Sequence, residues 1–293
     1  MSIPQVKILT SYIALLCLGK SDFEAIEAFR QDPYFAEALN IDQVPSAVTL
    51  HQRLDTQAAA FIAPIIEASI AFLQRIAAPI TPLANGLVSP DADVTPLNNA
   101  KTKKKGVSRA YKGDDGLAPM AAYLGQEGYC LEWELRAGSQ HCRKNTPALL
   151  QRVPARARRL TALPLLRLDR GNDALDNIAT VMAHNEAYPE AAPVHYLVKW
   201  NPHQKSPTQW LTYAEEHGDW RMPRPGKRVA LFEVRETRFL DGYEYRLRRV
   251  MRVIARTIDT HGQHLLIPDI EIEGWWTRLV GYGCKIVPVV RRS

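Results

Sequence analysis

Leu163-Pro-Leu-Leu-Arg-Leu-Asp-Arg-Gly-Asn-Asp173 is the stretch of sequence that decides the fold. Its apolar half predicts a short buried strand that ends at Asp169. Asn172 or Asp173 can then cap a helix that runs to Ala187. Charged residues that directly follow an apolar strand lie at its carboxyl end, where open α/β sheets place their sites. We therefore expect Asp169 to belong to a site.

The flanking sequence completes a sheet around this strand. Residues 129–135 alternate apolar and polar side chains with a clean period of two, which predicts a strand. Further strands are expected over 87–97, 117–124 and 194–200, and a helix over 146–160. Three hairpin-linked strands followed by helix-connected strands predict a mixed α/β sheet with helices on its faces. This order resembles a ribonuclease-H-like core, in which the first and fourth strands are neighbours.

Changes in sequence pattern divide the chain into four sections. Residues 1–82 carry apolar side chains at helical spacing, and the apolar stretch 58–77 predicts a long, well-buried helix. Residues 83–200 form the expected ribonuclease-H-like core. Residues 201–279 are strand-rich and are interpreted as an insertion, and residues 280–293 as an aberrant tail.

Composition and charge narrow the class of protein. The chain is 46% hydrophobic and 23% charged, which excludes a disordered or collagen-like chain. Residues 1–100 carry 5 lysines and arginines against 10 acids, whereas residues 101–159 carry 13 against 5. Such a basic block attracts polyanions, although a solvated loop without a partner has the same composition.

Targeting signals are missing from the sequence. The apolar stretch 8–18 is too short to span a bilayer, and it lacks the flanks of a signal peptide. The four cysteines form no Cys-x-x-Cys pair. We therefore expect a cytoplasmic protein with no membrane partner.

Acidic residues at two strand ends suggest a metal site. Asp91 and Asp93 lie two apart on the first core strand and so face the same way. If the first and fourth strands are neighbours, Asp93 and Asp169 lie about one strand spacing apart, roughly 5 Å. Carboxylates this close suit Mg²⁺ or Mn²⁺, and two such ions support phosphodiester chemistry. From spacing alone, Asp169 as a helix cap with Asp91 and Asp93 as turn residues is the favoured alternative.

Three stretches resemble motifs of DDE-type insertion-sequence transposases. Asp91–Gly113 resembles the first-aspartate region of that family, and Glu134–His141 also resembles it. Leu166–Asp173 resembles the second-aspartate motif, which in the family usually reads Asp-Ser-Gly where this chain has Asp169-Arg-Gly. The resemblance runs over about residues 6–279.

This resemblance implies DNA cleavage and strand joining. It implies Asp93 and Asp169 as the catalytic residues and the metal ligands. Asp93 is preferred to Asp91 because the family pattern is an apolar-flanked aspartate followed by a small or hydroxyl residue. The implied partners are the element's terminal repeats and target DNA, with a homo-oligomer as an open alternative.

Basic residues near the expected site are interpreted as DNA contacts, which position DNA without reading its sequence. The polar segment 101–116 predicts a loop after the first aspartate strand. Arg170 has an alternative partner in Asp173, and Lys199 is alternatively a snorkelling residue at the sheet edge. The expected DNA-binding residues are Lys101, Lys103, Lys104, Lys105, Arg109, Lys112, Arg136, His141, Arg170 and Lys199.

The third acid of the family motif is missing. The family carries a glutamate on a helix beyond the insertion, but residues 280–293 contain no acid, and no Tyr-x-x-Arg-x-x-x-Glu occurs from Trp200 onward. Glu271 and Glu273 alternate on an expected strand and make poor substitutes. A truncated or frame-shifted gene explains this pattern, so we expect an impaired transposase with an incomplete two-metal site. The alternative is a non-catalytic DNA-binding protein that pairs with an intact transposase and inhibits it.

Overall fold

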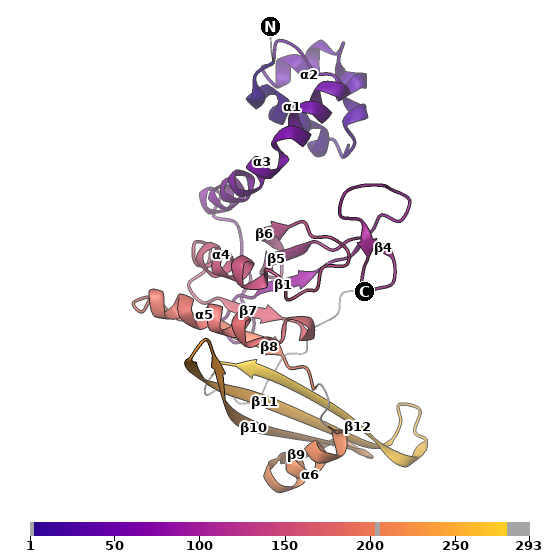
Figure 1. The fold of residues 1–293 in the computed structure, drawn as a ribbon, viewed down its shortest axis with the longest axis vertical. Helices are drawn as coiled ribbons and strands as arrows, with labels where there is room; N and C mark the ends of the chain where they lie inside the picture. The colour runs from indigo at the N-terminus through magenta and orange to yellow at the C-terminus, as the bar shows by residue number, and fades with distance from the viewer. Residues whose placement is uncertain (1–2, 203–205, 280–293) are drawn as a thin grey trace. The chain divides into compact units, whose positions relative to one another are not determined.

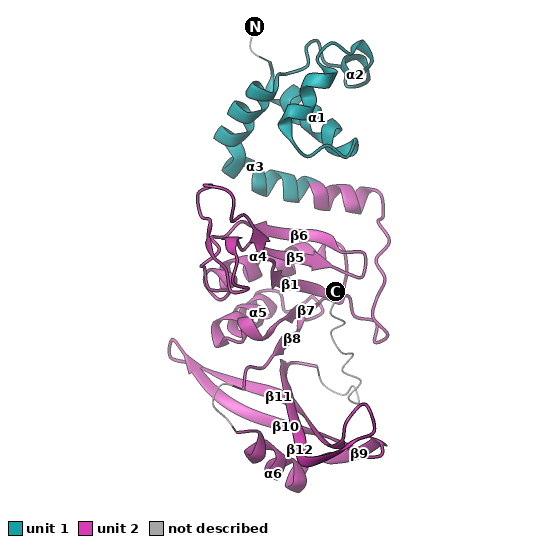
Figure 2. Ribbon diagram, turned by 90° about the vertical axis from the view of Figure 1, so that its right-hand side faces the viewer, with its two compact units in different colours: residues 1–68 teal, residues 69–293 magenta. Residues whose placement is uncertain are grey.

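The structure, a computed structural model, describes residues 3–202 and 206–279. The chain forms two compact units, residues 1–68 and 69–293 (Figure 2). The boundary lies inside one long helix, and the predicted boundary at residue 82 lies after that helix. The expected tail, residues 280–293, lies outside the described residues.

The first unit is helical, as its apolar spacing predicts. Buried side chains from each helix, among them Ile8, Leu15, Ile26 and Phe35, form its core. Asp22 caps the second helix, because its carboxylate accepts a hydrogen bond from the Ala25 N–H at 2.9 Å. The helices are α1 (Gln5–Cys17), the 3-10 helix η1 (Phe23–Phe29), α2 (Pro33–Ala38) and the first part of α3 (Ala47–Arg75).

Helix α3 differs from its prediction. It begins at Ala47, before the apolar stretch 58–77, and the burial expected for that stretch is wrong, because most of it is exposed. Ile62, Ile65 and Phe72 are among its exposed apolar side chains. By length and composition alone α3 is apolar enough to cross a membrane, a property that core helices of soluble proteins share.

The second unit is built on one large mixed sheet. Within the described residues nine strands join in the order β6-β5-β1-β7-β8-β12-β11-β10-β9 (Figure 1). The first five strands of this order come from the expected core: β1 (Pro90–Val94), β5 (Met120–Leu124), β6 (Tyr129–Glu134), β7 (Leu165–Leu168) and β8 (His195–Lys199). β1 begins at its proline, where a missing N–H costs the ladder nothing.

Pairing within this core follows the predicted connections. β5 pairs antiparallel with both β1 and β6, whereas β7 pairs parallel with both β1 and β8. Parallel neighbours need crossovers, and α4 (Thr146–Arg158) and α5 (Leu175–Ala187) supply them. The two helices pack on each other, and the sheet side chains that join their core include Ala92 and Val94. Because successive side chains point to opposite faces, Asp91 and Asp93 face away from these helices.

The expected loop after β1 contains a small second sheet, so its prediction as a plain loop is wrong. Three short strands pair in the order β2-β4-β3. Close backbone approach makes this pairing possible, since a Cβ on Gly116 would lie 1.8 Å from the carbonyl oxygen of Leu97. The strands are β2 (Leu97–Asn98), β3 (Ser108–Arg109) and β4 (Asp115–Leu117).

The strand-rich section extends the core sheet. β12 pairs antiparallel with β8, with Trp275 opposite Lys199, and β11, β10 and β9 follow in turn. Asp241 and Gly242, both at positive φ, make the β10–β11 turn. The elements are α6 (Pro207–His217), β9 (Asp219–Arg224), β10 (Lys227–Leu240), β11 (Tyr243–Ile258) and β12 (His264–Thr277).

Candidate metal centre

Two aspartates meet where β1 and β7 run side by side. In the parallel pairing of these strands, Ala92 lies opposite Leu168. The next residue along each strand is Asp93 and Asp169, which places their Cα atoms about one strand spacing apart, roughly 5 Å. The adjacency of the first and fourth strands, predicted from the sequence, is therefore confirmed.

The electrostatics of Asp93 reflect this neighbour. Partial removal of water from the carboxyl raises its pKa, and the negative charge of Asp169 raises it further. The hydrogen bond from the Val94 N–H, 2.7 Å from Oδ1, and the positive charge of Lys112 act in the opposite direction but do not cancel the rise. A cation between Asp93 and Asp169 would relieve the repulsion between their negative charges, so the pair is a candidate cation site.

Asp91 is engaged differently, although it lies on the same face of β1. Its carboxylate accepts hydrogen bonds from Nε and Nη2 of Arg167, its partner in the β1–β7 register. The hydroxyl of Ser89 donates to the same carboxylate. Asp91 is thus neutralised within the protein, which favours Asp93 as the first member of a metal pair.

Asp169 is not a capping residue in the usual sense. It precedes the 3-10 helix η2 (Arg170–Asn172), and its side chain makes no cap hydrogen bond. Instead Oδ1 accepts a hydrogen bond from Nδ2 of the buried Asn172 at 2.8 Å. The expected capping of α5 by Asn172 or Asp173 is wrong, because Ala174 occupies the N-cap position and makes no side-chain bond.

Two further side chains lie near the aspartate pair, and no sequence motif pointed to either of them. Partial loss of water raises the pKa of the exposed Tyr111, and the charges of Asp93 and Asp169 raise it further. The Cys142 thiol donates to the carbonyl oxygen of Gly171 at 2.9 Å, and its pKa is raised by burial first and by Asp169 second. Tyr111 lies in the turn between β3 and β4, and Cys142 lies in the loop between β6 and α4.

The pair fits a hard divalent cation. Asp93 and Asp169 are exposed and supply carboxylate oxygens, which Mg²⁺ and Mn²⁺ prefer. Over residues 3–202 and 206–279, no group of three or more His, Cys, Asp or Glu side chains converges as a metal site. Glu271 and Glu273 serve elsewhere, since Glu271 pairs with Arg256 and Glu273 pairs with Arg252 and Lys199.

Most of the expected DNA-contacting side chains are on the surface. Arg109 lies 3.9 Å from Asp115 in an exposed pair, and Lys112 contributes positive charge at Asp93. The Nδ1 atom of exposed His141 accepts a hydrogen bond from the Arg143 N–H at 3.2 Å. The exposed members of the predicted set are Lys101, Lys103, Lys104, Lys105, Arg109, Lys112, His141 and Arg170.

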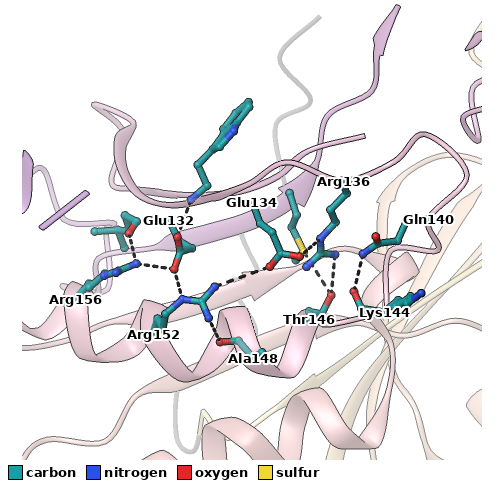
Figure 3. A network of polar contacts seen from close by, with 12 residues as sticks. Glu132, Glu134, Arg136, Gln140, Lys144, Thr146, Ala148, Arg152 and Arg156 are labelled. Atoms are coloured by element: carbon teal, nitrogen blue, oxygen red, sulfur yellow. Dashed lines mark hydrogen bonds and ion pairs between the residues drawn. The ribbon is translucent and has the colours of Figure 1, made fainter. Parts of the chain in front are cut away.

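Arg136 is buried, so its prediction as a DNA contact is wrong. It is 2% exposed and forms an ion pair with Glu134 at 2.9 Å (Figure 3). Its Nη1 donates to the carbonyl oxygen of Cys142 at 3.1 Å and to the hydroxyl of Thr146 at 3.3 Å. Arg136 therefore holds the loop that brings Cys142 toward Asp169.

Lys199, the last of the expected residues, and the exposed Arg170 have defined neighbours. Lys199 is half-buried, and its Nζ lies 3.8 Å from Oε1 of Glu273. Arg170 lines an open cavity with Arg256 and Asp269. Asp173, the alternative partner for Arg170, accepts its hydrogen bonds from other groups, the backbone of Asn201 and the indole of Trp276.

The chain has only weak similarity to known proteins. No family model matches the chain, and no curated protein matches it in sequence. Among solved structures, a piggyBac transposase synaptic complex with hairpin DNA matches with a TM-score of 0.32 and 10% identity, over 93% of this chain. The chain spans about half of that protein, 52%. Because these similarities are low, the function proposed below is derived from this chain's own residues.

Proposed function

We propose that this chain is a DNA-processing protein of the DDE-transposase type, in which Asp93 and Asp169 hold Mg²⁺ or Mn²⁺. The observation that carries the proposal is the meeting of these two carboxylates at neighbouring strand positions, where the negative charge of Asp169 helps to raise the pKa of Asp93. A divalent cation held there would polarise a phosphodiester and lower the pKa of bound water.

The topology of the core supports the same proposal. A hairpin trio followed by two parallel strands, with both crossover helices in one hydrophobic core, agrees with the ribonuclease-H-like fold that the sequence resembles. The carboxylates lie on the opposite face of β1 from this core. That face leaves them open to a polynucleotide.

DNA is the proposed partner because of the charge next to the site. The loop that follows β1 carries exposed lysines and reaches Lys112, whose charge acts on Asp93. Lysine side chains in this loop would neutralise the backbone phosphates of DNA and hold a strand over the carboxylates. We place this activity in the cytoplasm.

Catalysis is proposed to be weak. Across the described residues the aspartate pair has no third carboxylate partner, and Glu271 and Glu273 are held by arginines. A site with fewer ligands binds its ions less tightly and positions a nucleophile less well. The second candidate, a DNA-binding protein without catalysis, rests on this same observation.

Nicking of supercoiled plasmid DNA in the presence of Mn²⁺ tests the proposal. The full chain is compared with the double variant Asp93→Asn, Asp169→Asn, and Mn²⁺ binding is followed by electron paramagnetic resonance in the same samples. We expect the wild type to bind Mn²⁺ and to nick slowly, and the double variant to do neither. Mn²⁺ binding without nicking would favour the second candidate, and equal Mn²⁺ binding by both proteins would refute the metal centre.

A further inference from the structure

A buried arginine lies among three tryptophans where the insertion meets the core. Arg249, on β11, is 2% exposed. Its guanidinium carbon lies 4.5 Å from the ring centre of Trp200, 4.7 Å from that of Trp276 and 5.1 Å from that of Trp210. Trp200 follows β8 of the core, whereas Trp276 on β12 and Trp210 on α6 belong to the insertion. The Arg249 guanidinium therefore contacts both core and insertion.

The burial of this charge needs compensation. Cation–π contact with several rings provides part of it. Glu236 lies 3.7 Å from Nη1 of Arg249, and the negative charge of Asp173 also acts on the guanidinium. Among the described residues the Nε atom of Arg249 has no hydrogen-bond partner, so rings and charges, rather than a full set of hydrogen bonds, hold the side chain.

Trp276 of this cluster also holds the loop that carries Asp169. Nε1 of Trp276 donates to Oδ1 of Asp173 at 2.8 Å, and the Asn201 N–H donates to Oδ2 at 2.7 Å. Asp173 directly follows Asn172, whose amide donates to the Asp169 carboxylate. A chain of contacts therefore leads from the insertion to the carboxylate.

Within this loop the backbone gives local reporters of its order. The Asn172 N–H donates to the carbonyl oxygen of Asp169, and the Asp173 N–H donates to that of Arg170, both at 3.2 Å. These two turn bonds form η2 and are not part of the sheet ladder. Their stability depends on what anchors the end of the loop at Asp173.

We propose that Trp276 and Arg249 are positioning residues, which fix the Asp169 loop through Asp173 and so make the orientation of the second carboxylate depend on the insertion. The importance of that orientation for metal binding rests on the function proposed above. The mechanical coupling itself does not, because it is a property of the metal-free protein.

Hydrogen exchange of the Asn172 and Asp173 amides, measured in metal-free full-length protein, tests the coupling. Trp276→Phe keeps a ring in place and removes the donor to Asp173. Trp275→Phe is the matched control, since Trp275 is the adjacent buried tryptophan on the same strand and points to the other face. We expect Trp276→Phe to speed exchange of both amides about tenfold relative to the control, which corresponds to the loss of one hydrogen bond to a charged group.

Two further measurements keep the proposal falsifiable. If Trp276→Phe does not fold, Asp173→Ala removes the same hydrogen bond from the loop side and should give the same faster exchange. Equal exchange in Asp173→Ala and wild type, or in both tryptophan variants, would overturn the coupling. Titration with Mn²⁺ alone separates the two proposals: faster exchange in a protein whose wild type binds no Mn²⁺ supports the coupling while refuting the metal centre.

Discussion

Arg167 forms a two-point ion pair with Asp91, with Nε on one carboxylate oxygen and Nη2 on the other. These two residues are register partners on β1 and β7, and two positions further along the same face Asp93 lies beside Asp169. One level of the sheet therefore places a cation opposite an anion, and the next places two anions together. A divalent ion at the second level would do what Arg167 does at the first.

Because Asp91 is paired with Arg167 and Asp93 lies beside Asp169, substitutions of the two aspartates should affect metal binding differently. Asp93→Asn should weaken Mn²⁺ binding at least about tenfold, because losing a carboxylate that contacts the ion costs no less than losing a group that only supports such a ligand. Asp91→Asn should leave Mn²⁺ affinity within about threefold of wild type, since its carboxylate is already neutralised. Titration by electron paramagnetic resonance measures both, and the reverse ranking would exchange the roles of the two residues.

The raised pKa of Asp93 predicts how stability depends on pH. A carboxyl whose folded pKa lies above its unfolded value destabilises the fold once it ionises, so Asp93→Asn should stabilise the metal-free protein at pH 7. The gain should fall as pH is lowered through the folded pKa and disappear below about pH 4, where both states are protonated. Solvent screening keeps it below about 1 kcal/mol.

Urea unfolding in EDTA at pH 4, 5.5 and 7 measures this effect. Asp91→Asn is the matched control and should destabilise the protein at pH 7, because it leaves half-buried Arg167 without its partner. A loss of stability at pH 7 in Asp93→Asn would contradict the repulsion between the two carboxylates.

Local pattern and connection order were enough to predict the core of the site. Alternation predicted β6, and the run of hairpin and crossover connections predicted that β1 and β7 are neighbours, which brings Asp93 to Asp169. Both signals are short-range or topological, and neither depends on which side chains fill the core.

What the sequence could not predict depends on long-range packing. Arg136 comes just after a strand, where a charged side chain is expected to be exposed. Its burial depends on Cys142 and Thr146, which accept hydrogen bonds from its guanidinium. The role of Asp173 likewise required Trp276, 103 residues away. The exposure of α3 escaped prediction because apolar composition alone does not say what a helix packs against.

The ion-pair network between β6 and α4 predicts a large stability effect. Glu132 is almost fully buried and pairs with both Arg152 and Arg156, the latter also largely buried (Figure 3). Glu132→Gln would remove the buried carboxylate that Arg152 and Arg156 share, so we expect a loss of about 3–5 kcal/mol. Glu134→Gln, at a more exposed carboxylate on the same strand, should cost about 1 kcal/mol. Urea unfolding compares the two, and equal losses would show that the burial of Glu132 does not govern the effect.

The basic loop after β1 should dominate the salt dependence of DNA binding. Each phosphate contact contributes about 0.9 to the slope of log affinity against log salt concentration. Replacing the four exposed lysines between residues 101 and 105 by glutamine should therefore lower the affinity for duplex DNA and reduce the slope by up to about 3–4. Fluorescence anisotropy at several salt concentrations measures both quantities.

A charge-matched variant shows whether position matters or net charge alone. It removes four exposed cations outside the loop by substitution with glutamine, at Lys20, Arg30, Arg75 and Arg221. Because these side chains are not next to the carboxylate pair in sequence or on its strands, the slope should stay near the wild-type value. If the two variants reduced the slope equally, attraction would come from the overall charge of +6, and the loop would lose its assignment as the DNA contact beside Asp93 and Asp169.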